Sequence, residues 1–557
     1  MESSAIEPAV RLIPLGGLGE IGLNMMLVEF GDDLIAVDCG LMFPDPDEMP
    51  GIDYVIPDFS YAVGKRDGFR AVLLTHGHED HVGAVPYLLR QVRVPVYGTP
   101  LTLALLGEKL REHGLGESAD LRPLRPRDRV EIGPFRVEPI RVTHSIADGI
   151  GLAIDTPVGV VVHTGDFKLD PSPLDGEPPD YRKFAELGEQ GVLVLLSDST
   201  NVERPGHTRS EAEVGQALRE RFRSARGRIV LATFASHVHR IQQVLALAAE
   251  HGRSVALLGM SMERNVRVAA ELGYLRVPEG VLLSLEDLAR LPPERQVILS
   301  TGSQGEPNSA LALMAAGEHK AMQVERGDLV IISARVIPGH ERTIGRVVNA
   351  LLRRGAEVLY EDNAFVHVSG HASQEELKLM LSLTRPRFFM PVHGEYRHLV
   401  AHARLARSLG FTAEQVLLVE DGVGVEVTKT AARVIGRYPV GRVLVDGKGV
   451  GDIGAVVLRD RQILAESGLV AVSLVFDREG RLVSGPEIAS RGFVHVQENQ
   501  PLIEELKQAV VEALDRREPG RVWDREATAG LVRSTVRSFI NQRFQRKPVV
   551  LPMILEV

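Results

Sequence analysis

The stretch "LLTHGHEDHVGAVPYLLR", residues Leu73–Arg90, places three histidines and two carboxylates within six positions directly after an apolar run. Four of these residues follow the pattern H-x-H-x-D-H, in which a loop presents two imidazoles and the first turn of a helix presents a carboxylate and a third imidazole: His76, His78, Asp80 and His81. Nitrogen and oxygen ligands without thiolate suit Zn or Mn. A polar helix start with Asp80 near a cap position would explain one or two of these residues but not all four. The stretch therefore predicts a metal site just past a buried strand.

Length and composition describe an ordinary globular protein of several domains. The 557 residues exceed what one core usually serves, and at roughly 100–200 residues per domain the chain is expected to hold about three to four. Hydrophobic residues make up 44% and charged residues 25%, which excludes a disordered or fibrous class. The net charge of −10 argues against a surface that binds nucleic acid everywhere, although a local basic groove is compatible with it.

Cysteine usage and the N-terminus indicate the compartment. Cys39 is the only cysteine, which excludes an intramolecular disulfide and a thiolate zinc cage and is typical of a reducing environment. The start "MESSAIEPAVRLIPLGG" has no basic region followed by an apolar core, and no apolar run reaches about 18 residues. We therefore expect a cytoplasmic protein with no membrane span.

Apolar strands followed by a polar or Gly-rich turn and an amphipathic pattern recur along the chain, which indicates a layered α/β fold. From about residue 210 to 365 the units change in character and predict a separate open sheet. After about residue 440, "GRVLVDGKGVGDIG" is typical of a connector, and "LVAVSLVFDREGRLV" predicts a hairpin before two amphipathic helices with Trp523 between them. The predicted domains are a first part at 1–210, an inserted domain at 211–365, the second part of the first domain at 366–440, a linker at 441–465 and a C-terminal α+β domain at 466–557.

One motif supplies too few ligands for two metal ions, so further ligands are expected past other strand ends. Three residues follow apolar runs in this way: His144 in "IRVTHSIAD", Asp166 in "VVVHTGDFKLD" and His393 in "FFMPVHGEYRHL". Taken singly, His144 or His393 would more often be an ordinary polar residue at a strand end. Taken together, the seven residues complete two adjacent sites if Asp166 bridges, and two adjacent ions are suited to an in-line displacement at phosphorus.

This set of motifs resembles the metallo-β-lactamase superfamily. The segment between Asp198 and His371 is similar to the β-CASP insertion of its nucleic-acid-processing members, whose extra motifs match "SDSTN", "HVSGHAS" and "PVHGEY". Together with "TFASHVHRIQQV", "TGSQGEP" and the terminal "RKPVVLPMILEV", the chain resembles the bacterial ribonuclease J family over essentially its whole length. The resemblance implies a metallo-β-lactamase αββα sandwich with an inserted β-CASP α/β domain and a small C-terminal α+β domain.

The resemblance also implies a role for each motif residue. Two divalent ions, Zn and/or Mn, would be held by two ligand sets that share one aspartate: His76, His78, His144 and Asp166 for one ion, and Asp80, His81, Asp166 and His393 for the other. Asp198 and His371 would form the acid–base pair. On local sequence alone, Asp198 is equally well explained as a cap or turn residue.

The loop before "QEELKLML" predicts an anion pocket. Ser373 followed by Glu376 forms a capping-box pattern, so the preceding residues lie at a helix N-terminus, where free N–H groups favour an anion. The resemblance implies that this pocket binds an RNA phosphate through the residues Ser369, Gly370, His371, Ala372 and Ser373, with Ser236 facing it from the inserted domain. The alternative is an ordinary capped helix.

Two positions depart from the family pattern. His237 and His340 stand where members often carry Asn, so their contacts with RNA stay open. The basic run "RERFRSARGR", Arg219 to Arg228, is expected to face solvent rather than phosphate.

The function implied is a two-metal ribonuclease that acts on single-stranded RNA, in mRNA decay and in rRNA or other RNA maturation. Internal cutting and 5′-to-3′ trimming that prefers 5′-monophosphate ends are both implied, as are a homodimer through the C-terminal domain and partners in an RNA-degradation complex. A DNA nuclease of the same β-CASP group is the first alternative. A small-molecule metallo-hydrolase and an RNA-binding scaffold with a degenerate site are the others, although the inserted segment and the complete ligand set argue against them.

Overall fold

The structure is a computed structural model that describes residues 7–45, 48–337, 340–516 and 524–557. The chain divides into two compact units, one comprising Met1–Met42 and Ile56–Arg442 and the other Phe43–Val55 and Val443–Val557. Among the described residues no helix is both long and apolar enough to cross a membrane. Trp523, predicted to lie between two helices, falls outside the described residues.

Two facing sheets form the core of the first unit. The eight-stranded sheet has the order β22 (Ala432–Arg437), β21 (Val423–Val427), β1 (Val10–Gly16), β3 (Met25–Phe30), β4 (Asp33–Val37), β6 (Phe69–Leu73), β7 (Val96–Gly98) and β8 (Leu121–Pro123). The six-stranded sheet has the order β19 (Phe388–Val392), β13 (Val192–Asp198), β12 (Val160–His163), β11 (Ile150–Asp155), β10 (Phe135–Arg141) and β9 (Val130–Ile132).

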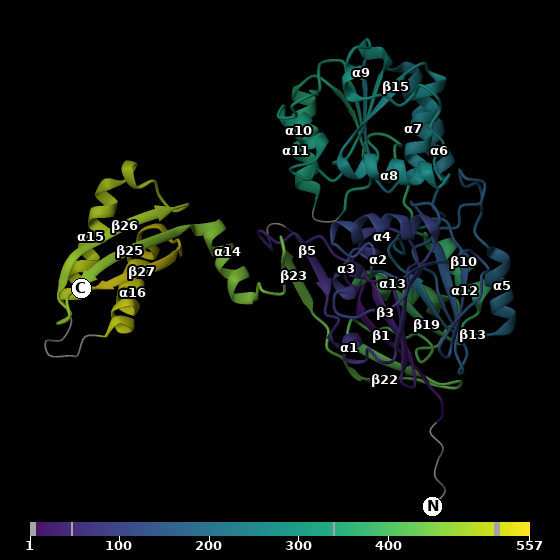
Figure 1. The fold of residues 1–557 in the computed structure, drawn as a ribbon, viewed down its shortest axis with the longest axis horizontal. Helices are drawn as coiled ribbons and strands as arrows, with labels where there is room; N and C mark the ends of the chain where they lie inside the picture. The colour runs from purple at the N-terminus through teal and green to yellow at the C-terminus, as the bar shows by residue number, and fades with distance from the viewer. Residues whose placement is uncertain (1–6, 46–47, 338–339, 517–523) are drawn as a thin grey trace, which may run out of the picture. The chain divides into compact units, whose positions relative to one another are not determined.

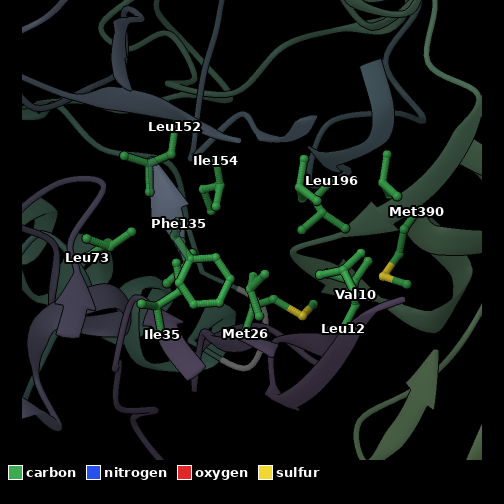
Figure 2. Close-up of a cluster of buried hydrophobic side chains, with 14 of the residues drawn as sticks. Val10, Leu12, Met26, Ile35, Leu73, Phe135, Leu152, Ile154, Leu196 and Met390 are labelled. Carbon is green, nitrogen blue, oxygen red and sulfur yellow. The ribbon is translucent and has the colours of Figure 1, made fainter. Parts of the chain in front are cut away.

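Buried side chains from both sheets meet in one hydrophobic cluster. Figure 2 shows Val10, Leu12, Met26, Ile35 and Leu73 of the larger sheet opposite Phe135, Leu152, Ile154, Leu196 and Met390 of the smaller one. A second cluster covers the outer face of the smaller sheet with the helices α5 (Tyr181–Gln190), α12 (Gln374–Thr384) and α13 (Tyr396–Ser408). On the larger sheet, α4 (Pro100–Glu112) packs against β7 and β8. This arrangement confirms the predicted αββα sandwich.

The inserted segment forms its own parallel sheet, as predicted. Its strand order is β15 (Ser254–Leu258), β16 (Gln296–Ser300), β14 (Ile229–Ala232), β17 (Leu329–Ile332) and β18 (Glu357–Leu359). Figure 1 shows helices on both faces of this sheet. One apolar cluster holds α6 (Glu211–Ser224), α7 (Val238–Glu250) and α8 (Met260–Glu271), and the other holds α9 (Leu285–Ala289), α10 (Ala310–Ala316) and α11 (Glu341–Arg353). Strands buried on both faces explain the continuous apolar runs in this part of the sequence.

The second unit contains the predicted hairpin of β25 (Leu469–Phe476) and β26 (Leu482–Arg491), with β27 (Val549–Glu556) parallel to β25 on its other side. Helices α15 (Gln500–Asp515) and α16 (Arg525–Phe544) bury the alternate apolar residues of these strands in one core. The segment 441–465, expected to be a linker, contains β23 (Arg442–Asp446), β24 (Gly449–Val450) and most of α14 (Ala455–Ser467). Gly447, with φ of 57°, lies in the tight turn between the two strands.

Candidate metal centre

Parallel strands bring the predicted ligands to one edge of the smaller sheet. Neighbouring strands β12, β13 and β19 are parallel, and just at or past their carboxyl ends lie Asp166, Asp198 and His393. β10 runs in the same direction as β12, because both are antiparallel to β11, and His144 follows it. The H-x-H-x-D-H motif follows β6 of the facing sheet and enters the short helix α2 (Glu79–Val82). Because these strands run in the same direction, residues that are far apart in the sequence lie together at one edge of the sheet.

Three groups of candidate ligand atoms lie close together at this edge, and the third is formed by Asp198, His371 and His393. The first consists of His76, His78, His144 and Asp166, and the second of Asp80, His81, Asp166 and His393. Within each group the candidate ligand atoms all lie within 4.8 Å of one another. The first two groups are the two sets that the family resemblance implied.

In the first group, Nδ1 of His78 lies 3.0 Å from Nε2 of His76 and 3.2 Å from Nε2 of His144. Oδ2 of Asp166 lies 3.7 Å from each of the two Nε2 atoms. Three imidazoles and one carboxylate at such spacing form a donor set that fits Zn or Mn.

The second group shares Asp166. Its Oδ2 lies 3.3 Å from Nε2 of His81, and its Oδ1 lies 3.4 Å from Nε2 of His393. Asp80 Oδ2 lies 3.5 Å from the same two nitrogens. Nε2 of His393 is buried and has no hydrogen-bond partner among the described residues, so an electrophilic partner at this point would satisfy it. A divalent ion fits that requirement.

The other ring nitrogen of four candidate ligands is anchored by a neighbour. His76 Nδ1 lies 3.0 Å from Thr75 Oγ1, His81 Nδ1 lies 2.8 Å from Asp38 Oδ2, His144 Nδ1 lies 2.8 Å from the Gly370 carbonyl, and His393 Nδ1 lies 2.5 Å from Thr200 Oγ1. Such outer partners set the tautomer and orientation of a metal-binding histidine. The Nε2 atoms of the four rings lie 3.3–3.7 Å from the Asp166 carboxylate oxygens.

Asp38 was missed by the sequence analysis. It follows the apolar run of β4, is 1% exposed, and accepts hydrogen bonds from the backbone N–H and hydroxyl of Thr75 besides its contact with His81. Its φ of 62° is unusual for a residue with a side chain. The sequence did contain an indication of Asp38, because this aspartate directly follows an apolar run in "LIAVDCG". The same kind of pattern pointed to Asp166.

Electrostatics keep the first imidazole group neutral. Burial lowers the pKa of His78 to about 4 and lowers the pKa values of His76 and His144 well below the usual range. Burial acts to raise the pKa of Asp166, but the charges of His393 and His81 outweigh it and lower the pKa. Neutral imidazoles and an ionised carboxylate are the forms that bind metal ions.

The predicted acid–base pair lies beside the second group. His371 Nδ1 is 2.8 Å from Asp198 Oδ2, and the His371 ring stacks on His393 with 5.3 Å between ring centroids. Asp198 is 1% exposed. Burial acts to raise its pKa, but the adjacent histidines together have the larger effect and the pKa lies below its usual range. An ionised Asp198 therefore holds a histidine next to the candidate ions.

Comparisons with known proteins match four family models along the chain. Residues 18–230 match the metallo-beta-lactamase superfamily, 226–351 the ribonuclease J beta-CASP domain, 356–417 the Zn-dependent metallo-hydrolase RNA specificity domain, and 456–557 the ribonuclease J C-terminal domain. The chain is 42% identical to ribonuclease J2 of Bacillus subtilis, with 98% of this chain and 99% of that protein covered. It belongs to the ribonuclease J family.

Other relatives support the same assignment. Ribonuclease J of Thermus thermophilus is 43% identical over 98% of this chain and 95% of its own length. Ribonuclease J 1 of Streptococcus pyogenes is 41% identical over 100% of this chain and 99% of its own length. A crystal structure of a protein of unknown function from Enterococcus faecalis covers 75% of this chain and 100% of its own with a TM-score of 0.54 at 16% identity, which concerns the fold alone.

In this ribonuclease J family member, the predicted phosphate loop makes contacts within itself and with neighbouring residues. Ser373 caps α12 with the predicted capping box, and its hydroxyl lies 2.9 Å from Thr208 Oγ1. Ser369 Oγ accepts the backbone N–H of His371. Gly370 is required by close approach, because a Cβ there would lie 2.6 Å from the His144 ring. Ala372 is buried.

The remaining predicted residues lie in the inserted segment. Ser236 is half-buried in the turn after β14, where its carbonyl accepts the Val238 N–H, and its role opposite the phosphate loop stays a prediction. His237 is 1% exposed and lies 3.3 Å from the Glu211 carboxylate, so its side chain packs inside the protein. His340 is half-buried and precedes α11.

The basic run faces solvent over most of its length, as predicted. Arg219 is exposed and pairs with Glu250, and Arg221, Arg223 and Arg226 are exposed. Arg228 is the exception, because it is buried and donates to Asp328.

Proposed function

We propose that this chain is a two-metal ribonuclease that hydrolyses RNA phosphodiester bonds. The observation that carries the proposal is the position of Asp166, whose Oδ2 lies 3.7 Å from Nε2 of His76 and His144 in the first group and 3.3 Å from Nε2 of His81 in the second. RNA as the substrate is supported by the relatives named ribonuclease J and by the match of residues 356–417 to an RNA specificity domain. The test is digestion of end-labelled RNA and a matched DNA oligonucleotide with added Zn or Mn.

The candidate ligands would hold two divalent ions that, when bound, supply Lewis acidity toward the phosphate and make a water nucleophile available at neutral pH. The protein must then supply a proton to the leaving 3′ oxygen as its bond to phosphorus breaks. His371 is suited to donate it from Nε2, because Asp198 holds Nδ1 and stabilises the protonated ring. The products are a 5′-phosphate and a 3′-hydroxyl.

Outer partners should tune metal affinity. We expect Asp38→Ala to weaken binding of Zn or Mn by about 10–100-fold, the usual effect of removing the outer partner of a metal-binding histidine. Calorimetric titration of metal-free protein measures it. Asp33→Ala is the matched control, since Asp33 opens the same strand and contacts Arg70 on the surface. Equal affinity for wild type and Asp38→Ala would show that Asp38 does not support the site.

Both trimming from the 5′ end and internal cutting are part of the proposal. The loop Ser369 to Ser373 contains the candidate acid, so a terminal phosphate held there would lie close to the ions. The backbone N–H groups at the start of α12, expected to be free, already donate inside the protein, Gln374 to the Arg204 carbonyl and Glu375 to the Gly206 carbonyl, so side-chain donors of the loop would have to bind the phosphate. A 5′-monophosphate suits such donors, whereas a triphosphate carries additional groups that the pocket must exclude and a 5′-hydroxyl has no charge.

Trimming should therefore be fastest for a 5′-monophosphate among three otherwise identical RNAs that carry a 5′-hydroxyl, monophosphate or triphosphate. Release of labelled mononucleotide measures it. Ser369→Ala should slow trimming more than internal cutting. Ser210→Ala is the control, because it removes a serine hydroxyl that closes a capping box, at a cost of about 1 kcal/mol, without touching the loop. Equal rates from the three RNAs would show that the loop does not recognise the 5′ phosphate.

A DNA nuclease of the same β-CASP group is the alternative function, since the same ligands and acid pair would serve it. Equal rates on RNA and DNA oligonucleotides of one sequence would favour it. A small-molecule hydrolase has no use for the inserted domain and is not proposed.

We also propose a homodimer through the C-terminal domain, RNA-degradation complex partners and a cytoplasmic location. The dimer is supported by the outward face of β27, where three apolar side chains are roughly half exposed: Leu551 at 48%, Met553 at 46% and Leu555 at 57%. The location is supported by the single cysteine.

A further inference from the structure

A side chain of the inserted domain reaches the loop that carries the candidate acid pair. Arg335, in the turn after β17, donates from its guanidinium to Oδ1 of Asn201 at 2.9 Å. The turn itself is held by Gln304, which is 3% exposed, donates to the Arg335 carbonyl at 2.8 Å and accepts the Ile337 N–H at 2.8 Å. Arg335 is thus supported by two loops of the inserted sheet.

Asn201 continues the connection to His371. It is 4% exposed and donates from Nδ2 to the His371 carbonyl at 3.2 Å, an oxygen that also accepts the Thr208 hydroxyl at 2.8 Å. Asn201 lies three positions after Asp198, which binds the His371 ring. The acid is therefore held from both ends, its ring by Asp198 and its backbone by Asn201.

The chemistry of the two contacts fixes the orientation of the Asn201 amide. A guanidinium has donors only, and a carbonyl oxygen has acceptors only. Oδ1 must therefore face Arg335, and Nδ2 must face His371. Without Arg335 the amide keeps only its bond to the His371 carbonyl, so one of the two contacts that orient Asn201 is lost.

We propose that Arg335 is a positioning residue for proton donation: through Asn201 it holds the His371 backbone, which makes the acid dependent on the docking of the inserted domain. The proposal rests on the proposed function, in which His371 is the acid. A displacement of about 1 Å in a catalytic group costs up to about 10²-fold in rate, so loss of one support is expected to be measurable.

The test compares two substrates. Arg335→Ala should lower kcat on RNA by roughly 10–100-fold with KM nearly unchanged, as expected for a misplaced acid. A phosphodiester with a p-nitrophenolate leaving group needs no proton donor, so the same variant should hydrolyse it at the wild-type rate. Arg335→Lys, which keeps a donor, should recover part of the rate on RNA.

Two further variants distinguish loss of the Arg335–Asn201–His371 connection from a general loss of structure. Asn201→Asp keeps the size of the side chain and the acceptor for Arg335 but removes the donor to His371, so it should behave like Arg335→Ala. Arg335→Ala combined with His371→Ala should be no slower than His371→Ala alone, because both act through one group. Arg204→Ala is the matched control, since Arg204 is exposed and its charge lies near Arg335.

Three results would overturn the proposal: equal slowing of both substrates, additive slowing in the double variant, or a rise in KM with a weaker dependence on salt. The last would mean that Arg335 contacts an RNA phosphate directly. A wild-type rate for His371→Ala would refute the proposed acid itself, whereas a normal His371→Ala effect with an unaffected Arg335→Ala would refute only the bridge.

Discussion

Replacing Asp166 by alanine should abolish RNA cleavage while RNA binding largely persists. Asp166 is the one carboxylate shared by both ligand groups, and each of its oxygens lies within 3.4 Å of a candidate imidazole ligand. Removing it deprives both ions of a ligand and leaves buried imidazoles without their counter-charge. We expect a loss of about 10³-fold or more, because even one missing group that stabilises transition-state charge costs roughly 10²–10³-fold.

Three measurements make that expectation specific. Cleavage of labelled RNA gives the rate, filter binding gives RNA affinity, and elemental analysis gives the metal content. Asp155→Ala is the matched control, since Asp155 ends the neighbouring strand β11 and pairs with Arg136 near the surface, where such pairs contribute little. Near-normal cleavage by Asp166→Ala with full metal content would rule out the two-metal mechanism.

Replacing His371 by alanine should slow cleavage by roughly 10²–10⁴-fold, the usual contribution of general acid catalysis, with the metal content unchanged. Asp198→Asn should act in the same direction, because Asp198 Oδ2 holds His371 Nδ1 at 2.8 Å. His207→Ala is the control, since His207 is an exposed histidine in the segment that connects Asp198, at the end of β13, to α6.

The leaving group decides whether His371 is the acid. Rates on RNA and on a p-nitrophenyl phosphodiester should diverge, with the His371→Ala defect largely confined to RNA. A defect of the same size on both substrates would assign His371 a role other than proton donation.

The layered α/β class and the placement of ligands at strand ends were predictable because they depend on local patterns, whereas the αββα arrangement of the layers came from the family resemblance. An apolar run followed by His or Asp indicates a strand end, and parallel strands bring such ends together, as for Asp166 and His393. The capping box of Ser373 and Glu376 was likewise readable from four residues. The assignment of each ligand to one of two groups came from the family resemblance, and the structure brings the same residues together.

Features that depend on tertiary contacts were not predictable. Asp38 acts through His81, 43 positions away, and Arg335 contacts Asn201 across 134 positions. The Ser373 hydroxyl was expected to face a phosphate, yet it lies against Thr208, which no spacing in the sequence indicates. His237 could equally have been an exposed contact or a buried residue, and its packing beside Glu211 is decided by the inserted fold.

The most direct test of the central claim is the cleavage rate of end-labelled single-stranded RNA as Zn or Mn is added back to chelator-treated protein. The account predicts no cleavage without metal, a rate that rises more steeply than in proportion to the ion concentration because two ions are needed, and little cleavage of a DNA oligonucleotide of the same sequence. Cleavage that survives complete removal of metal, or equal rates on RNA and DNA, would contradict it.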